Sequence, residues 1–187
     1  MPDYLALLGC GEQVELLGRA LGDVTALLLE LSQYAANSRM GVLAVVNRVL
    51  RILGDGEIEE GQIWEAAMFA GFRKLDNLCV IVDNNNLQID GPIDEVCSPY
   101  PIDKKFESFN FHVINIDGND FDEIKRAFDE ARATKGMPTA IIAHTVKGKG
   151  VSYMENSVGW HGKAPNDEEY AVAMEDLRKA GEALCQK

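Results

Sequence analysis

Two short polar segments have the residue types and the spacing to hold a metal ion and a phosphate group. Gly54-Asp55-Gly56 places a carboxylate between two residues that permit tight turns, directly ahead of a predicted helix. After 27 further residues, Asn84-Asn85 follows a predicted strand. Carboxylate and amide oxygens suit Mg²⁺ shared with a phosphate, and a helix N-terminus would help to bind a diphosphate. Either segment alone would more simply be a turn or a solvated loop, but together they favour a Mg²⁺–diphosphate site.

The rest of the sequence alternates apolar runs, typical of strands, with helical patterns. These predicted strands and helices must position the two polar segments. Strands are predicted at residues 48–53, 78–82, 111–116 and 139–143, and helices at 61–74, from Asp120 and from Asn166. The alternation predicts an α/β fold, a parallel sheet with helices on both faces, in a domain spanning residues 48–187. Ligands of such sheets bind outside the carboxyl ends of the strands, so the two polar segments should meet at one edge.

The helical spacing also predicts which side chains are apolar neighbours on each helix. The set for the first helix is Ile63, Ala67, Ala70 and Phe72. The set for the second helix is Phe121, Ile124, Phe128 and Ala131. The set for the last helix, capped by residues 166–169, is Tyr170, Met174, Leu177 and Leu184.

Charge and composition exclude several classes of protein. The 18 Lys and Arg against 30 Asp and Glu give a net charge of -12, which would repel a nucleic acid backbone. The longest apolar runs, such as residues 26–29, fall far short of the roughly 18 residues of a membrane span. The four cysteines are far apart and form no Cys-x-x-Cys pair. We therefore expect a cytoplasmic protein that binds neither nucleic acid nor membranes.

Residues 48–187 resemble the N-terminal section of transketolases, the part that binds the diphosphate of thiamine diphosphate. The resemblance rests on four segments in the order of the family, at residues 54–66, 83–91, 144–151 and 159–165. Other thiamine-diphosphate enzymes, such as pyruvate dehydrogenase, share the Gly-Asp-Gly element. They are not similar in the continuation at 57–66 or in the His-Gly-x-Ala-Pro segment.

The resemblance implies thiamine diphosphate and Mg²⁺ as cofactors. Asp55, the Asn85 side chain and the Leu87 carbonyl would coordinate Mg²⁺. The residues that would contact the cofactor are Gly54, Gly56, Glu57, Asn85 and His161. His161 would also contact the substrate as a catalytic residue, although a lone histidine is more often structural.

The implied function is two-carbon ketol transfer between sugar phosphates. The family also requires a pyrimidine-binding domain, and 187 residues cannot hold both domains. The implied partner is therefore a C-terminal transketolase section that carries this domain, within a homo- or hetero-oligomer. The alternative is a truncated, non-catalytic remnant of a transketolase that at most binds the cofactor.

Residues 1–47 are predicted to be a divergent helical segment, because the N-terminal helices and histidine-bearing loops of the family have no counterpart here. Residues 23–46 fit two hypotheses. In one, they derive from a shifted reading frame that is later restored, which the coding DNA would decide. In the other, they form a genuine amphipathic helix, since Leu21, Val24 and Leu28 have helical spacing.

Overall fold

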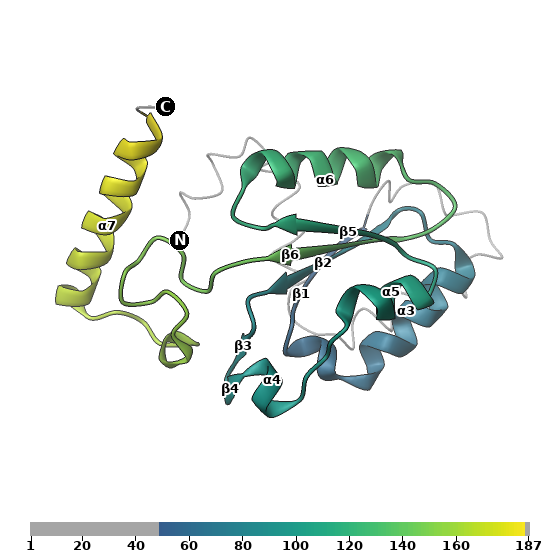
Figure 1. The fold of residues 1–187 in the computed structure, drawn as a ribbon, viewed down its shortest axis with the longest axis horizontal. Helices are drawn as coiled ribbons and strands as arrows, with labels where there is room; N and C mark the ends of the chain where they lie inside the picture. The colour runs from purple at the N-terminus through teal and green to yellow at the C-terminus, as the bar shows by residue number, and fades with distance from the viewer. Residues whose placement is uncertain (1–48, 186–187) are drawn as a thin grey trace. The chain divides into compact units, whose positions relative to one another are not determined.

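A four-stranded parallel sheet forms the centre of residues 49–185, the part of the chain that the computed structural model describes (Figure 1). The strands are β1 (Val49–Gly54), β2 (Leu78–Asn84), β5 (His112–Asp117) and β6 (Thr139–His144). Their order across the sheet is β1-β2-β6-β5, and each neighbouring pair is parallel. The predicted parallel α/β sheet is therefore confirmed.

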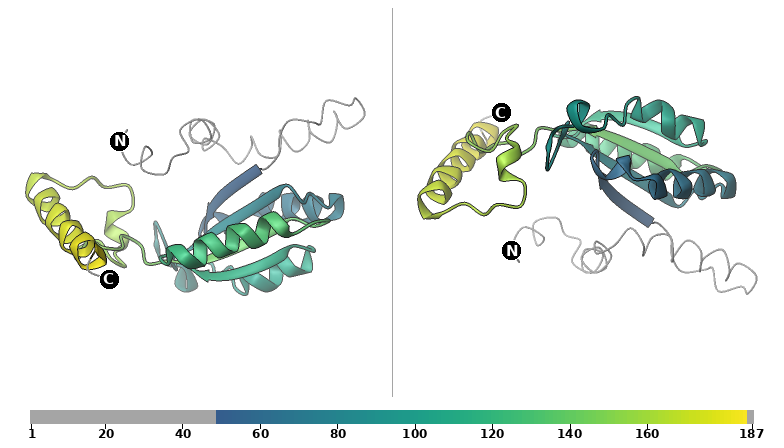
Figure 2. Two further views of the ribbon diagram at one scale, coloured as in Figure 1. Left: turned by 90° about the horizontal axis from the view of Figure 1, so that it is seen from above. Right: turned by 90° about the horizontal axis from the view of Figure 1, so that it is seen from below.

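Helices lie on both faces of this sheet. α6 covers one face, and α3 and α5 lie on the other (Figures 1 and 2). The longer helices are α3 (Gly61–Arg73), α5 (Ile102–Ser108), α6 (Phe121–Ala133) and α7 (Asp167–Cys185). The shorter helical turns are η2 (Glu57–Glu59), α4 (Ile93–Val96) and η3 (Val158–Trp160). A small antiparallel pair, β3 (Leu87–Gln88) with β4 (Gly91–Pro92), follows β2.

The core is built from alternate strand residues and from small residues of the helices. On the α6 side, Ala127 and Ala131 pack against Ile114, Ile116 and Ile141 of the sheet. On the opposite side, Phe106 of α5 is 1% exposed and its ring lies 5.2 Å from that of Trp64 on α3. Because alanine side chains are short, the α6 backbone can approach the sheet closely.

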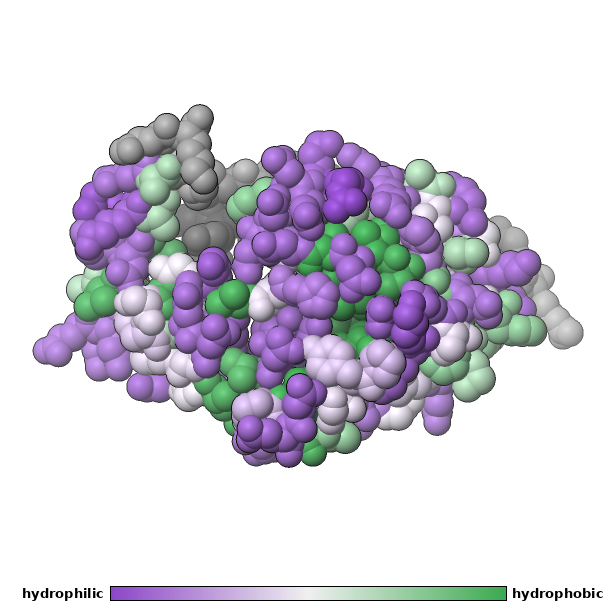
Figure 3. Space-filling model, viewed as in Figure 1, coloured by the Kyte–Doolittle hydropathy of each residue, from purple (hydrophilic) through white to green (hydrophobic). Residues whose placement is uncertain are grey.

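Two predictions about helix faces are wrong. Phe72 is 78% exposed, because it lies about half a turn from the buried Ile63 and Ala70 of α3. Phe121 is 79% exposed, because it is the first residue of α6 and precedes Ile124, which packs against the core. Figure 3 shows apolar residues (green) reaching the surface in several places on this face, among residues that are mostly hydrophilic (purple).

Asp120 caps α6, and its removal gives a testable loss of stability. Its carboxylate accepts hydrogen bonds from the backbone N–H groups of Asp122 (2.8 Å) and Glu123 (3.1 Å). We expect Asp120→Ala to lower the free energy of unfolding by about 1 kcal/mol in denaturant titration. Asp120→Asn keeps an acceptor oxygen and should lose less than half as much. Equal losses for both variants would contradict the cap.

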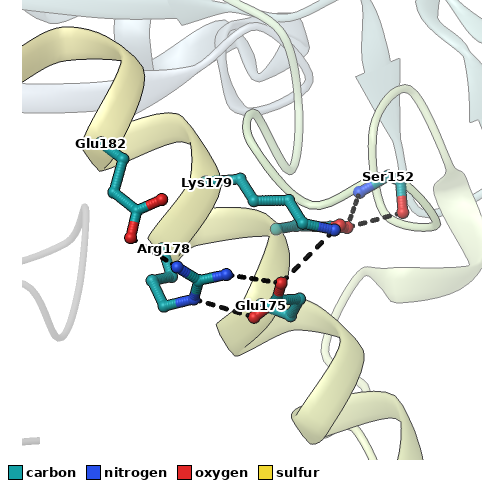
Figure 4. A network of polar contacts seen from close by, with 6 residues as sticks. Ser152, Glu175, Arg178, Lys179 and Glu182 are labelled. Carbon is teal, nitrogen blue, oxygen red and sulfur yellow. Dashed lines mark hydrogen bonds and ion pairs between the residues drawn. The ribbon is translucent and has the colours of Figure 1, made fainter. Parts of the chain in front are cut away.

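The last helix, α7, is capped as predicted and joined to the preceding loop. Asn166 and Glu169 exchange hydrogen bonds between side chain and backbone, at 2.9 and 2.8 Å. The backbone and side chain of Ser152 both donate to Asp176, at 3.0 and 2.6 Å. Figure 4 shows Ser152 beside the ion pairs that Arg178 forms along the outer face of the helix.

Part of the predicted apolar set on α7 is exposed. Tyr170, Met174 and Leu177 are 56%, 48% and 39% exposed, and the side chain of Leu184 lies outside the described residues. The helical segment predicted at residues 1–47, with both hypotheses about residues 23–46, also lies outside them. In the part that the structure describes, no helix has the length and apolarity needed to cross a bilayer.

Candidate functional site

The polar residues after the strands meet at one edge of the sheet. Gly54 at the end of β1 is the register partner of Asp83 on β2, and Asn84 is the register partner of His144 on β6. The turn after β1 is joined directly to β2, since the Asp55 N–H donates to the Asp83 carbonyl at 3.2 Å. The predicted convergence of the Gly-Asp-Gly and Asn-rich segments is therefore what the structure shows.

Asp55 lies at the centre of this edge. Its side chain is buried, and the residue is 1% exposed. One carboxylate oxygen accepts from the Gly56 N–H at 3.0 Å. The other oxygen accepts from the Asn84 side chain at 3.0 Å and from the Asn86 N–H at 2.5 Å. Since these donors come from both polar segments, the Asp55 carboxylate joins the two.

Burial governs the acidity of this carboxyl group. Desolvation raises the pKa of Asp55 above its ordinary value, while hydrogen bonds from Asn84 and Asn86 oppose that rise. The nearby charge of Asp83 raises the pKa further. Within residues 49–185, no ion pair joins Asp55 to a lysine or arginine. A carboxylate in this setting is one that a bound cation would stabilise.

Asn85 lies in the turn that follows β2, and Leu87 is the first residue of β3 after that turn. Asn85 is buried at 8% exposure, and its side-chain oxygen accepts from the Leu87 N–H at 3.1 Å. Between them, Asn86 has a left-handed backbone with φ of 64°, a conformation that asparagine tolerates better than most residues. This turn lies against Asp55, because Asn84 and Asn86 on either side of Asn85 both donate to that carboxylate.

These groups fit a divalent cation that is shared with a phosphate. A carboxylate, an amide oxygen and a backbone carbonyl are hard oxygen ligands of the kind that Mg²⁺ prefers. The described residues contain no cluster of three or more His, Cys, Asp or Glu that could enclose a metal by themselves. A cation bound here would therefore complete its coordination with ligand or water oxygens.

Gly56, the second glycine of the first segment, allows the turn after β1 to approach β3 closely. A Cβ atom on Gly56 would lie 2.9 Å from Cβ of Gln88, which real Cβ contacts essentially never show. Gly54 donates its N–H to the Glu57 carboxylate at 2.5 Å. Gln88 in turn donates to Glu59 at 3.2 Å, so the turn after β1 and strand β3 are held together.

Among the described residues, His161 is hydrogen-bonded to Lys147 and not to this centre. It follows η3, its side chain is exposed, and its Nδ1 accepts from the Lys147 ammonium group at 3.2 Å. Among the hydrogen bonds of the described residues, none joins His161 to Asp55 or Asn85.

The hydrogen-bonding roles of several residues at the site were not predicted from the sequence. Asn84 and Asn86 hold Asp55, and Tyr100 contacts both of these asparagines. Thr145, after β6, donates its hydroxyl to Asp83. The sequence analysis named Asn84 as part of the Asn-rich segment but not as a donor to Asp55. The strand register could have indicated Thr145, because it directly follows β6, the neighbour of β2. No spacing in the sequence indicates Tyr100.

Comparisons with known proteins agree with this geometry. The family model described as transketolase, thiamine diphosphate binding domain, matches residues 14–180. That match starts nearer to the N-terminus than the resemblance found over residues 48–187, and it crosses residues 23–46.

Two curated relatives are described as transketolase subunits. One, for 6-deoxy-6-sulfo-D-fructose and from Clostridium sp., is 43% identical over 135 residues, which are 72% of this chain and 49% of that protein. The other, for apulose-4-phosphate and from Phocaeicola vulgatus, is 41% identical over 133 residues, 71% of this chain and 47% of that protein. The chain therefore spans about half the length of these relatives.

A solved structure shares the fold. The crystal structure of transketolase from Campylobacter jejuni matches with a TM-score of 0.68 and 33% identity. The match covers 76% of this chain and 22% of that one. The predicted fold, a parallel sheet with helices of the thiamine-diphosphate-binding type, is thus confirmed by an independent comparison.

Proposed function

This chain belongs to the transketolase family, and we propose that it is the thiamine-diphosphate-binding part of an enzyme that transfers two-carbon ketol units between sugar phosphates. The observation that carries the proposal is the buried Asp55 carboxylate, which is held by the Asn-rich turn at the carboxyl ends of β1 and β2. A buried carboxylate with no ion-pair partner in residues 49–185 costs stability, and a cation bound with the cofactor would offset that cost.

We assign the Mg²⁺ ligands to Asp55, the Asn85 side chain and the Leu87 carbonyl. The support is their placement in two turns that contact one another, together with the oxygen chemistry of all three groups. The Asn85 oxygen now accepts from the Leu87 N–H. An amide oxygen has a second lone pair, so this hydrogen bond leaves it able to bind a cation.

The cofactor diphosphate is assigned to the first turn and to His161. The proposed contacts are with Gly54, Gly56, Glu57, Asn85 and His161. At Gly56 a side chain would collide with Gln88 of β3, so glycine allows this turn to lie against β3 next to Asp55.

Thiamine diphosphate, when bound, supplies the carbon nucleophile and the electron sink for breaking and forming the bond next to the ketose carbonyl. The chain contributes position and charge. Asp55 and Asn85 would fix the cation, and the Nε2–H of His161 would donate to a diphosphate or sugar oxygen. The Lys147 ammonium group lies 3.2 Å from Nδ1 of His161, and a hydrogen bond from it would leave Nε2 as the donor of a neutral ring.

Turnover is proposed to require a second chain that carries the pyrimidine-binding domain. The support is that relatives 43% and 41% identical to this chain are themselves described as transketolase subunits. The two chains would form a hetero-oligomer, and sugar phosphates would be its substrates.

The test is reconstitution. The full 187-residue chain is mixed with a C-terminal transketolase section in the presence of thiamine diphosphate, Mg²⁺, xylulose 5-phosphate and ribose 5-phosphate. We expect ketol transfer from the mixture and none from either chain alone. Binding of the cofactor without transfer by the mixture would favour the non-catalytic remnant, and the absence of both would reject the proposed function.

A further inference from the structure

We propose that Tyr100 is a positioning residue for the metal-binding turn, acting through Asn84 and Asn86 on Asp55. This inference rests on the proposed function, because it concerns the same cation site. Tyr100 lies between α4 and α5, outside every motif that the sequence analysis identified. It is 38% exposed, so its ring lies at the rim of the site and not in the core.

The Tyr100 hydroxyl sits between the two asparagines. It accepts a hydrogen bond from the Asn84 side-chain NH₂ group at 2.7 Å. It donates its own proton to the side-chain oxygen of Asn86. Burial raises the pKa of Tyr100, so the phenol keeps the proton that it donates. One hydroxyl group thus connects the side chains on either side of Asn85.

Asn84 and Asn86 both donate hydrogen bonds to Asp55, so the contacts with the Tyr100 hydroxyl also affect the position of these two bonds. The Asn84 NH₂ group has two protons, and Asp55 (3.0 Å) and Tyr100 (2.7 Å) are its two closer acceptors. The side-chain oxygen of Asn86 lies further away, at 3.4 Å. Tyr100 therefore fixes the orientation in which Asn84 can donate to the carboxylate.

Tyr100 also acts on Asp55 through the backbone of Asn86. Its left-handed conformation, with φ of 64°, directs the Asn86 N–H at the Asp55 carboxylate. A residue other than glycine is held in this region only where its surroundings favour it. The hydrogen bond from Tyr100 to the Asn86 side chain supplies such a constraint. Without it, we expect the turn to sample other conformations and the N–H to leave Asp55 more often.

The experiment compares Tyr100→Phe with Tyr153→Phe in the full chain. Phenylalanine keeps the ring and removes only the hydroxyl. The Tyr153 hydroxyl also donates to the protein, to the Glu169 carbonyl at 2.7 Å, but at α7 and not at the site. Calorimetry would measure binding of Mg²⁺ with thiamine diphosphate. We expect about 3- to 10-fold weaker Mg²⁺ affinity for Tyr100→Phe and no change for Tyr153→Phe.

A double-mutant cycle separates positioning from a general loss of structure. Asn86→Gly removes the acceptor for Tyr100 but tolerates a positive φ, so the backbone N–H can still reach Asp55. Once Asn86 is glycine, adding Tyr100→Phe should weaken Mg²⁺ binding by less than it does in the wild type, because the contact through Asn86 is already lost and only the contact with Asn84 remains. Fully additive losses would overturn the proposed route.

A measurement on the metal-free chain tests the role of Tyr100 independently of the proposed function. In the metal-free chain, hydrogen exchange of the Asn86 amide should be about 3- to 10-fold faster in Tyr100→Phe than in the wild type or Tyr153→Phe. Unchanged exchange and unchanged Mg²⁺ affinity would overturn the role of Tyr100. If the wild type itself bound no Mg²⁺ with the cofactor, the proposed function would fail, and amide exchange would still decide the role of Tyr100.

Discussion

Asp55→Asn is expected to weaken Mg²⁺-dependent binding of thiamine diphosphate by at least about 100-fold in calorimetry. The substitution keeps the size of the side chain and removes the negative charge that the proposed cation neutralises. Hydrogen bonds from Asn84 and the Asn86 N–H can still reach one side-chain oxygen, so the turn should stay in place. The loss would then report on charge and coordination and not on folding.

The matched control for this prediction is Asp94→Asn. Asp94 is an exposed carboxylate on α4 that accepts a hydrogen bond from Ser98 at 2.7 Å. It lies on the surface and outside the proposed ligand set, so its substitution should change cofactor affinity by less than about 2-fold. Similar losses for the two variants would contradict the assignment of Asp55 as the metal ligand.

Asp55→Asn should weaken cofactor binding, but it should increase the stability of the metal-free chain relative to the wild type as the pH rises. Because burial raises the pKa of Asp55 above its ordinary 3.8, the folded state binds the proton more tightly than the unfolded state. The stabilisation from protonation is complete below 3.8 and is lost as the pH rises through the raised pKa. We therefore expect the wild type to lose stability over that window, and Asp55→Asn to lose less. A parallel pH profile for both proteins would show that desolvation of Asp55 is unimportant.

The sheet and the edge that carries the site could be predicted from the sequence because both depend on local patterns. The run at residues 78–82 is apolar on both faces, which is a strong signal for a central parallel strand, and β2 is indeed central. Once β1 and β2 are parallel neighbours, the residues after them must meet. The proximity of Asp55 to the Asn-rich turn follows from topology alone.

The sequence could not predict which polar atoms of the site form hydrogen bonds with one another. Three consecutive asparagines have the same chemistry, and only the backbone of the turn decides that residues 84 and 86 donate to Asp55 while Asn85 does not. Tyr100 reaches the site because the β3–β4 pair and α4 fold the chain back. These short elements have no periodicity from which they could be predicted.

Gly71→Ala is expected to destabilise the fold by about 3 kcal/mol or more in denaturant titration. A Cβ atom at this position of α3 would lie 1.7 Å from the carbonyl oxygen of Phe109 and 2.9 Å from its carbonyl carbon. Both are backbone atoms, so no side-chain rotation can relieve the overlap. The helix would have to move away from the segment before β5, where the Trp64 ring packs near Phe109 and the Phe106 ring packs against Phe111.

Gly71→Ala should lower the stability of the fold, whereas helix propensity alone would predict an increase. Alanine favours a helix over glycine by about 1 kcal/mol, so the same exchange should stabilise a helix where space is open. Gly181 in α7 provides that control, since nothing lies within 4 Å of a Cβ placed there. We expect Gly181→Ala to be neutral or stabilising. Because α3 begins six residues after Asp55, its displacement in Gly71→Ala should also weaken cofactor binding. Unchanged stability of Gly71→Ala would mean that α3 does not pack as closely against Phe109 as the structure shows.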